Sequence, residues 1–317
     1  MRHKYSNHGF GLLGLAIEAV TGEPYRTWIK HEIIEAAGLE ATEPDMPIPN
    51  GVPFARGHTG ELLLRRRLVI PGDYTLNAMA PAGGFVSTAH DLAKFFAQLA
   101  PNAPRSVLSA ASRREMTRRH WRNPHSSIER YYGLGIMSGN TEGWEWFGHG
   151  GGLQGYISFT SVVPERELTV CILTNASDGW AGFWAEGALH ILRRFATRGA
   201  PSDKVRHWTG RWWNLWGAAD LVPVGDVVLV ANPWIFRDEG RPHPPADLHL
   251  SARRSVLLSR RQGWRRSALH WLDALAAVPA KGEGKLNERS ARFGEEPGGV
   301  RSGAPVALVL HARFPAQ

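Results

Sequence analysis

Two short groups of residues carry side chains suited to chemistry. Tyr5-Ser6-Asn7 places a phenol, a hydroxyl and a carboxamide directly before an amphipathic segment, where a loop can expose all three. His149-Gly150-Gly151-Gly152 places an imidazole beside three glycines, which weaken a strand unless a ligand or another backbone approaches closely. Both groups indicate the wall of a binding site. Taken singly, a chance triplet and a glycine turn explain them equally well.

Helical segments precede the second group. Between Phe10 and Ala37 apolar residues recur at helical spacing, and Thr21-Gly22-Glu23-Pro24 divides this stretch into a helix pair. The predicted apolar face of the first helix contains Leu12, Leu13, Leu15, Ala16, Ile17, Ala19 and Val20. A small-residue turn from Ala80 to Thr88 follows, and Ser87 or Thr88 is expected to cap the next helix.

Strand patterns surround His149. Alternating apolar residues predict four short strands, at Tyr132–Met137, Trp144–Phe147, Tyr156–Val163 and Leu168–Thr174. The short gaps between them favour antiparallel hairpins, with the glycine run between the second and third strands. A helix over 182–197 is predicted to follow.

A boundary is expected at Gly199-Ala200-Pro201-Ser202. The sequence therefore predicts three parts: a main domain over 1–199, the start of a small β domain over 200–236, and a basic, Pro/Gly/Arg-rich, poorly ordered segment over 237–317. The last segment carries 14 Lys+Arg and 8 Asp+Glu, so it supplies +6 of the net charge of +8. Its arginines are scattered as pairs, which is typical of a solvated surface, and no nucleic-acid partner is expected.

Composition narrows the class of protein. With 43% hydrophobic and 21% charged residues the 317-residue chain fits a globular protein, and no uncharged run reaches the length of about 18 residues that a membrane span needs. A single cysteine, Cys171, excludes an internal disulfide and a multi-cysteine zinc site. The presence of a single cysteine favours a cytoplasmic location. A periplasmic one stays open if the true start lies upstream of Met1.

Together, and in this order, the two groups resemble the second and third motifs of the penicillin-recognising serine hydrolases, especially class C β-lactamases and related esterases. Tyr5-Ser6-Asn7 is similar to the family's tyrosine-x-asparagine loop, and His149-Gly150-Gly151 to its lysine-or-histidine, small residue, glycine motif. The flanking Thr21–Tyr25, Gly83–Thr88 and Tyr132–Gly135 also look like family positions. The resemblance implies an α/β fold in which helices flank an antiparallel sheet, with no cofactor and no metal.

The family's nucleophile motif, a serine three residues before a lysine, occurs nowhere in the sequence. Only four residues precede Tyr5, whereas the family places its nucleophile and first strands upstream. The expectation is an N-terminally truncated serine hydrolase, without its first strands and nucleophile helix. Its parent activity would be acyl-enzyme hydrolysis of an ester, amide or β-lactam, and this chain is expected to be inactive.

The resemblance also implies roles. Tyr5 would act as general base and then acid, Asn7 would bind the amide or ester side of an acyl substrate, and His149 would help to hold a substrate carboxylate. Gly152 would supply one oxyanion N–H, with Gly150 and Gly151 lining the substrate strand. Gly150 stands where the family commonly has serine or threonine, so one hydroxyl contact to substrate is lost.

Structural interpretations of the same residues stay open. Tyr5 could be a half-buried aromatic, Asn7 a helix cap, His149 a strand residue bonded to backbone, and the glycines a bulge. Two other functions also stay open: a pseudo-enzyme that binds acylated ligands without turnover, and a basic interaction protein. Nothing in the sequence fixes the oligomeric state or the substrate.

Overall fold

The computed structural model of the chain describes residues 4–71, 74–123, 129–214, 217–231, 265–267 and 306–312. The chain divides into two units, the first of residues 1–189 with 288–315 and 317, and the second of 190–287 with 316. Each unit has its own antiparallel sheet. Among the described residues, no helix has both the length and the apolar character needed to cross a membrane.

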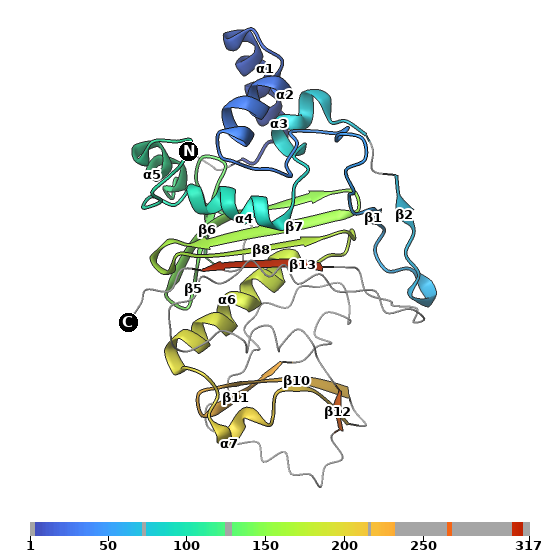
Figure 1. The fold of residues 1–317 in the computed structure, drawn as a ribbon, viewed down its shortest axis with the longest axis vertical. Coiled ribbons are helices and arrows are strands. Elements are labelled where there is room, and N and C mark those ends of the chain that lie inside the picture. The colour runs from blue at the N-terminus through green and yellow to red at the C-terminus, as the bar shows by residue number, and fades with distance from the viewer. Residues whose placement is uncertain are drawn as a thin grey trace. The chain divides into compact units, whose positions relative to one another are not determined.

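The first unit begins with the predicted helix pair (Figure 1). α1 spans Asn7–Thr21 and α2 spans Tyr25–Ile29, continued by a π-helical turn over Lys30–Glu35. Gly22, with φ of +74°, ends α1, because this left-handed conformation suits glycine. The remaining helices of this unit are α3 (Ala80–Gly83), α4 (Ala89–Gln98), α5 (Ala110–Thr117) and the first half of α6 (Ala181–Arg198), with short 3₁₀ turns at Leu63–Arg65, Asn77–Met79 and Pro164–Arg166.

The main sheet has seven strands in the order β13-β8-β7-β6-β5-β4-β3, and every neighbouring pair is antiparallel. This confirms the expected antiparallel sheet flanked by helices. The strands are β3 (Trp121–Arg122), β4 (Arg130–Tyr132), β5 (Met137–Thr141), β6 (Trp144–Leu153), β7 (Tyr156–Val163), β8 (Leu168–Thr174) and β13 (Val306–Ala312). A separate hairpin pairs β1 (Gly57–His58) with β2 (Val69–Ile70).

Two strand boundaries differ from the prediction. The stretch predicted as one strand from Tyr132 to Met137 is a turn between β4 and β5, with Gly135 at φ +73°. The glycine run does not lie between strands, because β6 continues through it to Leu153. Side chains of β7 fill the space that the glycines leave: a Cβ at Gly151 would lie 2.5 Å from the Ser158 Oγ. Cross-strand packing thus compensates for the poor strand propensity of glycine.

Helices cover both faces of the sheet. On one face α4 packs Ala89 and Ala93 against Cys171 of β8. On the other face Phe159 of β7 meets α6 at Gly182, where an added Cβ would lie 3.2 Å from the phenyl ring. The predicted cap of α4 is confirmed at Thr88, whose hydroxyl accepts a hydrogen bond from the Asp91 N–H at 3.2 Å.

α1 packs through its glycines rather than through its leucines. Gly11 and Gly14 are buried, and a Cβ at Gly14 would lie 2.2 Å from Pro81 of α3. Six of the seven apolar residues that define the predicted face are exposed: Leu12, Leu13, Leu15, Ala16, Ala19 and Val20. The helical periodicity is thus correct, but close approach of α3 makes the glycine stripe the buried one.

The second unit holds a four-stranded sheet in the order β11-β10-β9-β12. Its elements are the second half of α6, α7 (Asp203–Arg206), β9 (Gly210–Asn214), β10 (Gly217–Val224), β11 (Val227–Ala231) and β12 (Arg265–Ser267). Val222 and Val224 are buried against Ile191 and Phe195 of α6. Of the segment 237–317, predicted to be poorly ordered, only β12 and β13 lie within the described residues.

Candidate active site

Tyr5 and His149, 144 positions apart in the sequence, lie together in the first unit. Their rings are 26° from parallel with centroids 6.4 Å apart. Tyr132, the last residue of β4, completes the cluster: its ring meets that of Tyr5 edge-on at 6.0 Å. Its hydroxyl is 2.9 Å from the His149 Nε2. Three aromatic side chains from the start of α1, from β4 and from β6 therefore meet at one place.

The start of α1 positions Tyr5. Ser6 is the N-cap, and its hydroxyl accepts a hydrogen bond from the Gly9 N–H at 3.1 Å. Phe10, one turn further on, lies against the β4–β5 turn: a Cβ added at Gly135 would be 3.6 Å from its ring. The cap and this contact fix the direction in which the chain enters the helix, and hence where Tyr5 stands.

Hydrogen bonds determine the tautomer of His149. Its Nδ1 is 2.5 Å from the carbonyl oxygen of Gly150, which can only accept, so Nδ1 carries the proton. In the neutral ring Nε2 is then an acceptor, and the Tyr132 hydroxyl donates to it. Both ring nitrogens are engaged within the protein.

Burial keeps Tyr132 and His149 uncharged near neutral pH. Burial lowers the pKa of His149 below 6.5, although the hydrogen bond to Gly150 works in the opposite direction. Burial, and to a lesser extent the nearby Tyr5, raises the pKa of Tyr132 to about 12. Tyr132 is therefore a protonated donor, and His149 is neutral rather than the cation that binds a carboxylate best.

The far end of β6 offers backbone groups to a ligand. Leu153 and Tyr156 flank a two-residue turn, so alternate residues back along β6 direct their N–H and C=O away from β7. Gly150 and Gly152 are two of these. β5 pairs with β6 only as far as Gly148, so beyond this residue the described chain leaves that edge of β6 open.

The predicted site residues are thus only partly brought together. Three glycines follow His149 on β6: Gly150 is half-buried, and Gly151 and Gly152 are exposed. Asn7 is the first residue of α1, with its side chain exposed, and the helix cap is its neighbour Ser6. Within the described chain no group of three or more His, Cys, Asp or Glu side chains could hold a metal ion.

Sequence reasoning did not identify Tyr132 as a site residue. It was treated only as part of the Tyr132–Gly135 resemblance, because its contact with His149 depends on the register of β4, β5 and β6. Tyr132 pairs with Met137, which pairs with Gly148, one residue before the imidazole. An aromatic residue two strands from a candidate histidine is the available signal, and it needs the register to be usable.

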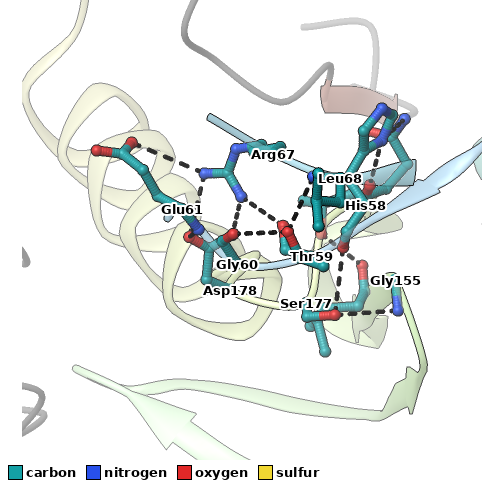
Figure 2. Close-up of polar contacts among 12 residues, drawn as sticks. His58, Thr59, Gly60, Glu61, Arg67, Leu68, Gly155, Ser177 and Asp178 are labelled. Atoms are coloured by element: carbon teal, nitrogen blue, oxygen red, sulfur yellow. Dashed lines mark hydrogen bonds and ion pairs between the residues drawn. The ribbon is translucent and has the colours of Figure 1, made fainter. Parts of the chain in front are cut away.

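A polar network anchors the turn that ends β6 (Figure 2). The Ser177 hydroxyl accepts from the Gly155 N–H at 3.1 Å and lies 3.2 Å from the His58 carbonyl oxygen, to which it donates. Gly57 lies so close to Gly155 that a Cβ added at Gly155 would be 2.8 Å from the Gly57 Cα. The β1–β2 hairpin and the β8–α6 loop therefore hold the end of the glycine strand in place.

Comparison with known proteins finds relatives of the chain. The β-lactamase family model matches residues 1–188, which is more than half of the chain. Penicillin-binding protein 4 of Amycolatopsis lactamdurans is 27% identical over 181 residues, covering 54% of this chain and 46% of that protein. The chain thus spans about half the length of the relative it matches.

Solved structures are also similar to the chain. The octameric penicillin-binding protein homologue from Pyrococcus abyssi is 26% identical, with a TM-score of 0.55 over 74% of this chain and 53% of that one. A D-stereospecific amidohydrolase from Streptomyces sp. is 29% identical, with a TM-score of 0.48 over 60% of this chain and 54% of that one.

Proposed function

Because this chain belongs to the β-lactamase family, we propose that its first unit recognises acyl compounds and that the chain of 317 residues does not hydrolyse them by itself. The ligand class is a small ester, amide or β-lactam. The observation that carries the proposal is the meeting of Tyr5 with His149 beside the open, glycine-lined end of β6.

Recognition would use the ring cluster and the strand edge together. The exposed Tyr5 ring offers an apolar face for the body of the ligand. The Gly152 N–H on the open edge of β6 is suited to donate to a carbonyl oxygen. The absence of side chains at Gly150–Gly152 lets the ligand approach the strand backbone closely. A carbonyl flanked by an apolar group fits both features.

The proposed lack of turnover follows from the absence of the family's nucleophile motif. Acyl-enzyme hydrolysis needs an activated hydroxyl, and no serine of this sequence stands three residues before a lysine.

Two measurements on the purified chain test the proposal. In an NMR titration with benzylpenicillin, the amide signals of Gly150–Gly152 are expected to shift. Tyr5→Ala should weaken binding about tenfold, since loss of an aromatic contact with its buried area costs about 1.4 kcal/mol. Nitrocefin and p-nitrophenyl acetate should be hydrolysed no faster than in buffer.

Tyr74→Ala is the matched control, because Tyr74 is also an exposed tyrosine but lies outside the ring cluster. It should bind like the unmodified chain. Unchanged glycine signals at saturating benzylpenicillin would contradict recognition. Nitrocefin turnover that Tyr5→Phe abolishes would contradict the absence of a nucleophile.

A further inference from the structure

The tip of the β1–β2 hairpin carries a cluster of exposed leucines outside the candidate active site. Leu63 and Leu64 are 91% and 90% exposed, and Leu62 beside them is exposed as well. On β2, Leu68 and Val69 are also exposed. Five large apolar side chains on one short hairpin are unusual for a soluble surface, where such residues normally occur singly.

The backbone holds the tip in a fixed shape. Leu64 has φ of +59°, in the left-handed region that large side chains rarely adopt. The Leu62 N–H donates to the Arg66 carbonyl at 2.8 Å and closes the turn. The turn thus holds Leu63 and Leu64 outward, whereas a flexible loop could fold them back onto the protein.

The base of the hairpin is clamped to the β8–α6 loop, as Figure 2 shows. The Arg67 guanidinium forms a two-point ion pair with Asp178 and donates to the Thr59 carbonyl at 3.0 Å. The Glu61 N–H donates to Asp178 at 3.0 Å. A hairpin with a rigid base can hold the leucines at its tip in position for contact with an apolar environment.

The charge around the tip is positive. Residues 53–71 contain four arginines and one glutamate, a net charge of +3. Asp178 neutralises Arg67, whereas Arg66, directly after the leucine turn, is exposed. An arginine beside a short apolar insertion is the pattern that suits an anionic membrane surface, since the leucines reach the acyl region while the guanidinium stays among phosphates.

We propose that the Leu62–Leu64 tip inserts into the surface of an anionic lipid bilayer and anchors the chain there peripherally. A protein partner fits less well, because a stable protein interface buries about 800 Å² on each side and a single turn cannot supply that area. Insertion of the leucines and attraction of arginine to anionic lipid together supply the apolar and electrostatic contributions on which peripheral membrane binding depends.

The test is co-sedimentation of the full chain with vesicles of phosphatidylcholine and phosphatidylglycerol at 3:1. The double variant Leu63→Ser/Leu64→Asn should lower the partition coefficient at least about tenfold, from the lost burial of two leucines. Asparagine tolerates the left-handed backbone at position 64. Arg66→Glu should weaken binding to these vesicles but not to pure phosphatidylcholine vesicles, and added salt should have the same effect.

Leu12→Ser/Leu13→Gln is the matched control, since these adjacent leucines of α1 are also exposed, at 67% and 58%. It should sediment with vesicles like the unmodified chain. Circular dichroism of each variant checks that the fold is retained. The proposal is overturned if the tip variant sediments normally or if the control loses binding equally. It also fails if the tip variant changes the size of the chain in gel filtration without lipid, because the tip would then be a protein contact.

Discussion

At the residue scale, the neutral state of His149 decides what the site can do. An imidazole whose nitrogens are bonded to Gly150 and Tyr132 has no free N–H for a ligand. Its two hydrogen bonds orient Tyr132 and the first glycine peptide of the motif. The carboxylate-holding role that the family resemblance implies stays a prediction, and the proposed ligand binding rests on the Tyr5 ring and the strand edge.

This arrangement predicts acid sensitivity. The folded-state pKa of His149 lies below its unfolded value of 6.5, so the unfolded chain takes up the proton first as pH falls. The free energy of unfolding should therefore decrease as pH drops from 6.5 towards the folded pKa. Urea unfolding at pH 7.5 and 5 should show a smaller loss for His149→Gln than for the unmodified chain. His31→Gln, at an exposed histidine, is the control and should retain the full loss. Equal losses in all three proteins would contradict the assignment.

The sequence was sufficient to pair Tyr5 with His149 as candidates, because each stands in a recognisable local pattern. It was insufficient for Tyr132, whose role arises from strand register. It also misplaced the glycine run as a turn, since the side chains that fill the space above those glycines, Ser158 and Phe159, come from the next strand. Local patterns indicated which residues matter, and cross-strand contacts determined how they meet.

At the element scale, α1 combines correct periodicity with an unexpected buried face. Its small residues let α3 approach, and its leucines remain exposed. Helix periodicity alone reports which residues share a face. It does not report which face is covered, because a glycine stripe and a leucine stripe can both pack.

Two glycine-to-alanine changes distinguish packing from helix propensity. Gly14→Ala should destabilise the protein by about 1–3 kcal/mol, because the new methyl group would overlap Pro81 at 2.2 Å. Gly187→Ala in α6 has no atom within 4 Å of the new Cβ and should stabilise by up to about 1 kcal/mol. Urea unfolding followed by circular dichroism measures both. A neutral or stabilising Gly14→Ala would show that α1 and α3 are not closely packed.

At the scale of the whole molecule, the chain divides into two units, each with its own core. The family match ends at residue 188, close to the boundary of the first unit at residue 189. The second unit has a separate small core around Val222 and Val224. The change of pattern near 199 in the sequence predicts the start of a small β domain, and the contacts divide the chain at residues 189 and 190, within α6.

Two cores predict two unfolding transitions in calorimetry. Ile34→Ala, at a fully buried residue of the first unit, should lower the midpoint of one transition, with a cost of about 2–5 kcal/mol. Val224→Ala, at a fully buried residue of the second unit, should lower the midpoint of the other. A single transition that both substitutions shift would show that the units unfold as one.

The single thiol of the chain offers a built-in reporter. Cys171 lies in the centre of β8 with no exposed surface, and burial raises its pKa to about 11 even though Thr160 donates to it. A disulfide reagent such as DTNB can therefore react only when the strands around it separate. The rate of labelling would time the opening of the main sheet without any added probe.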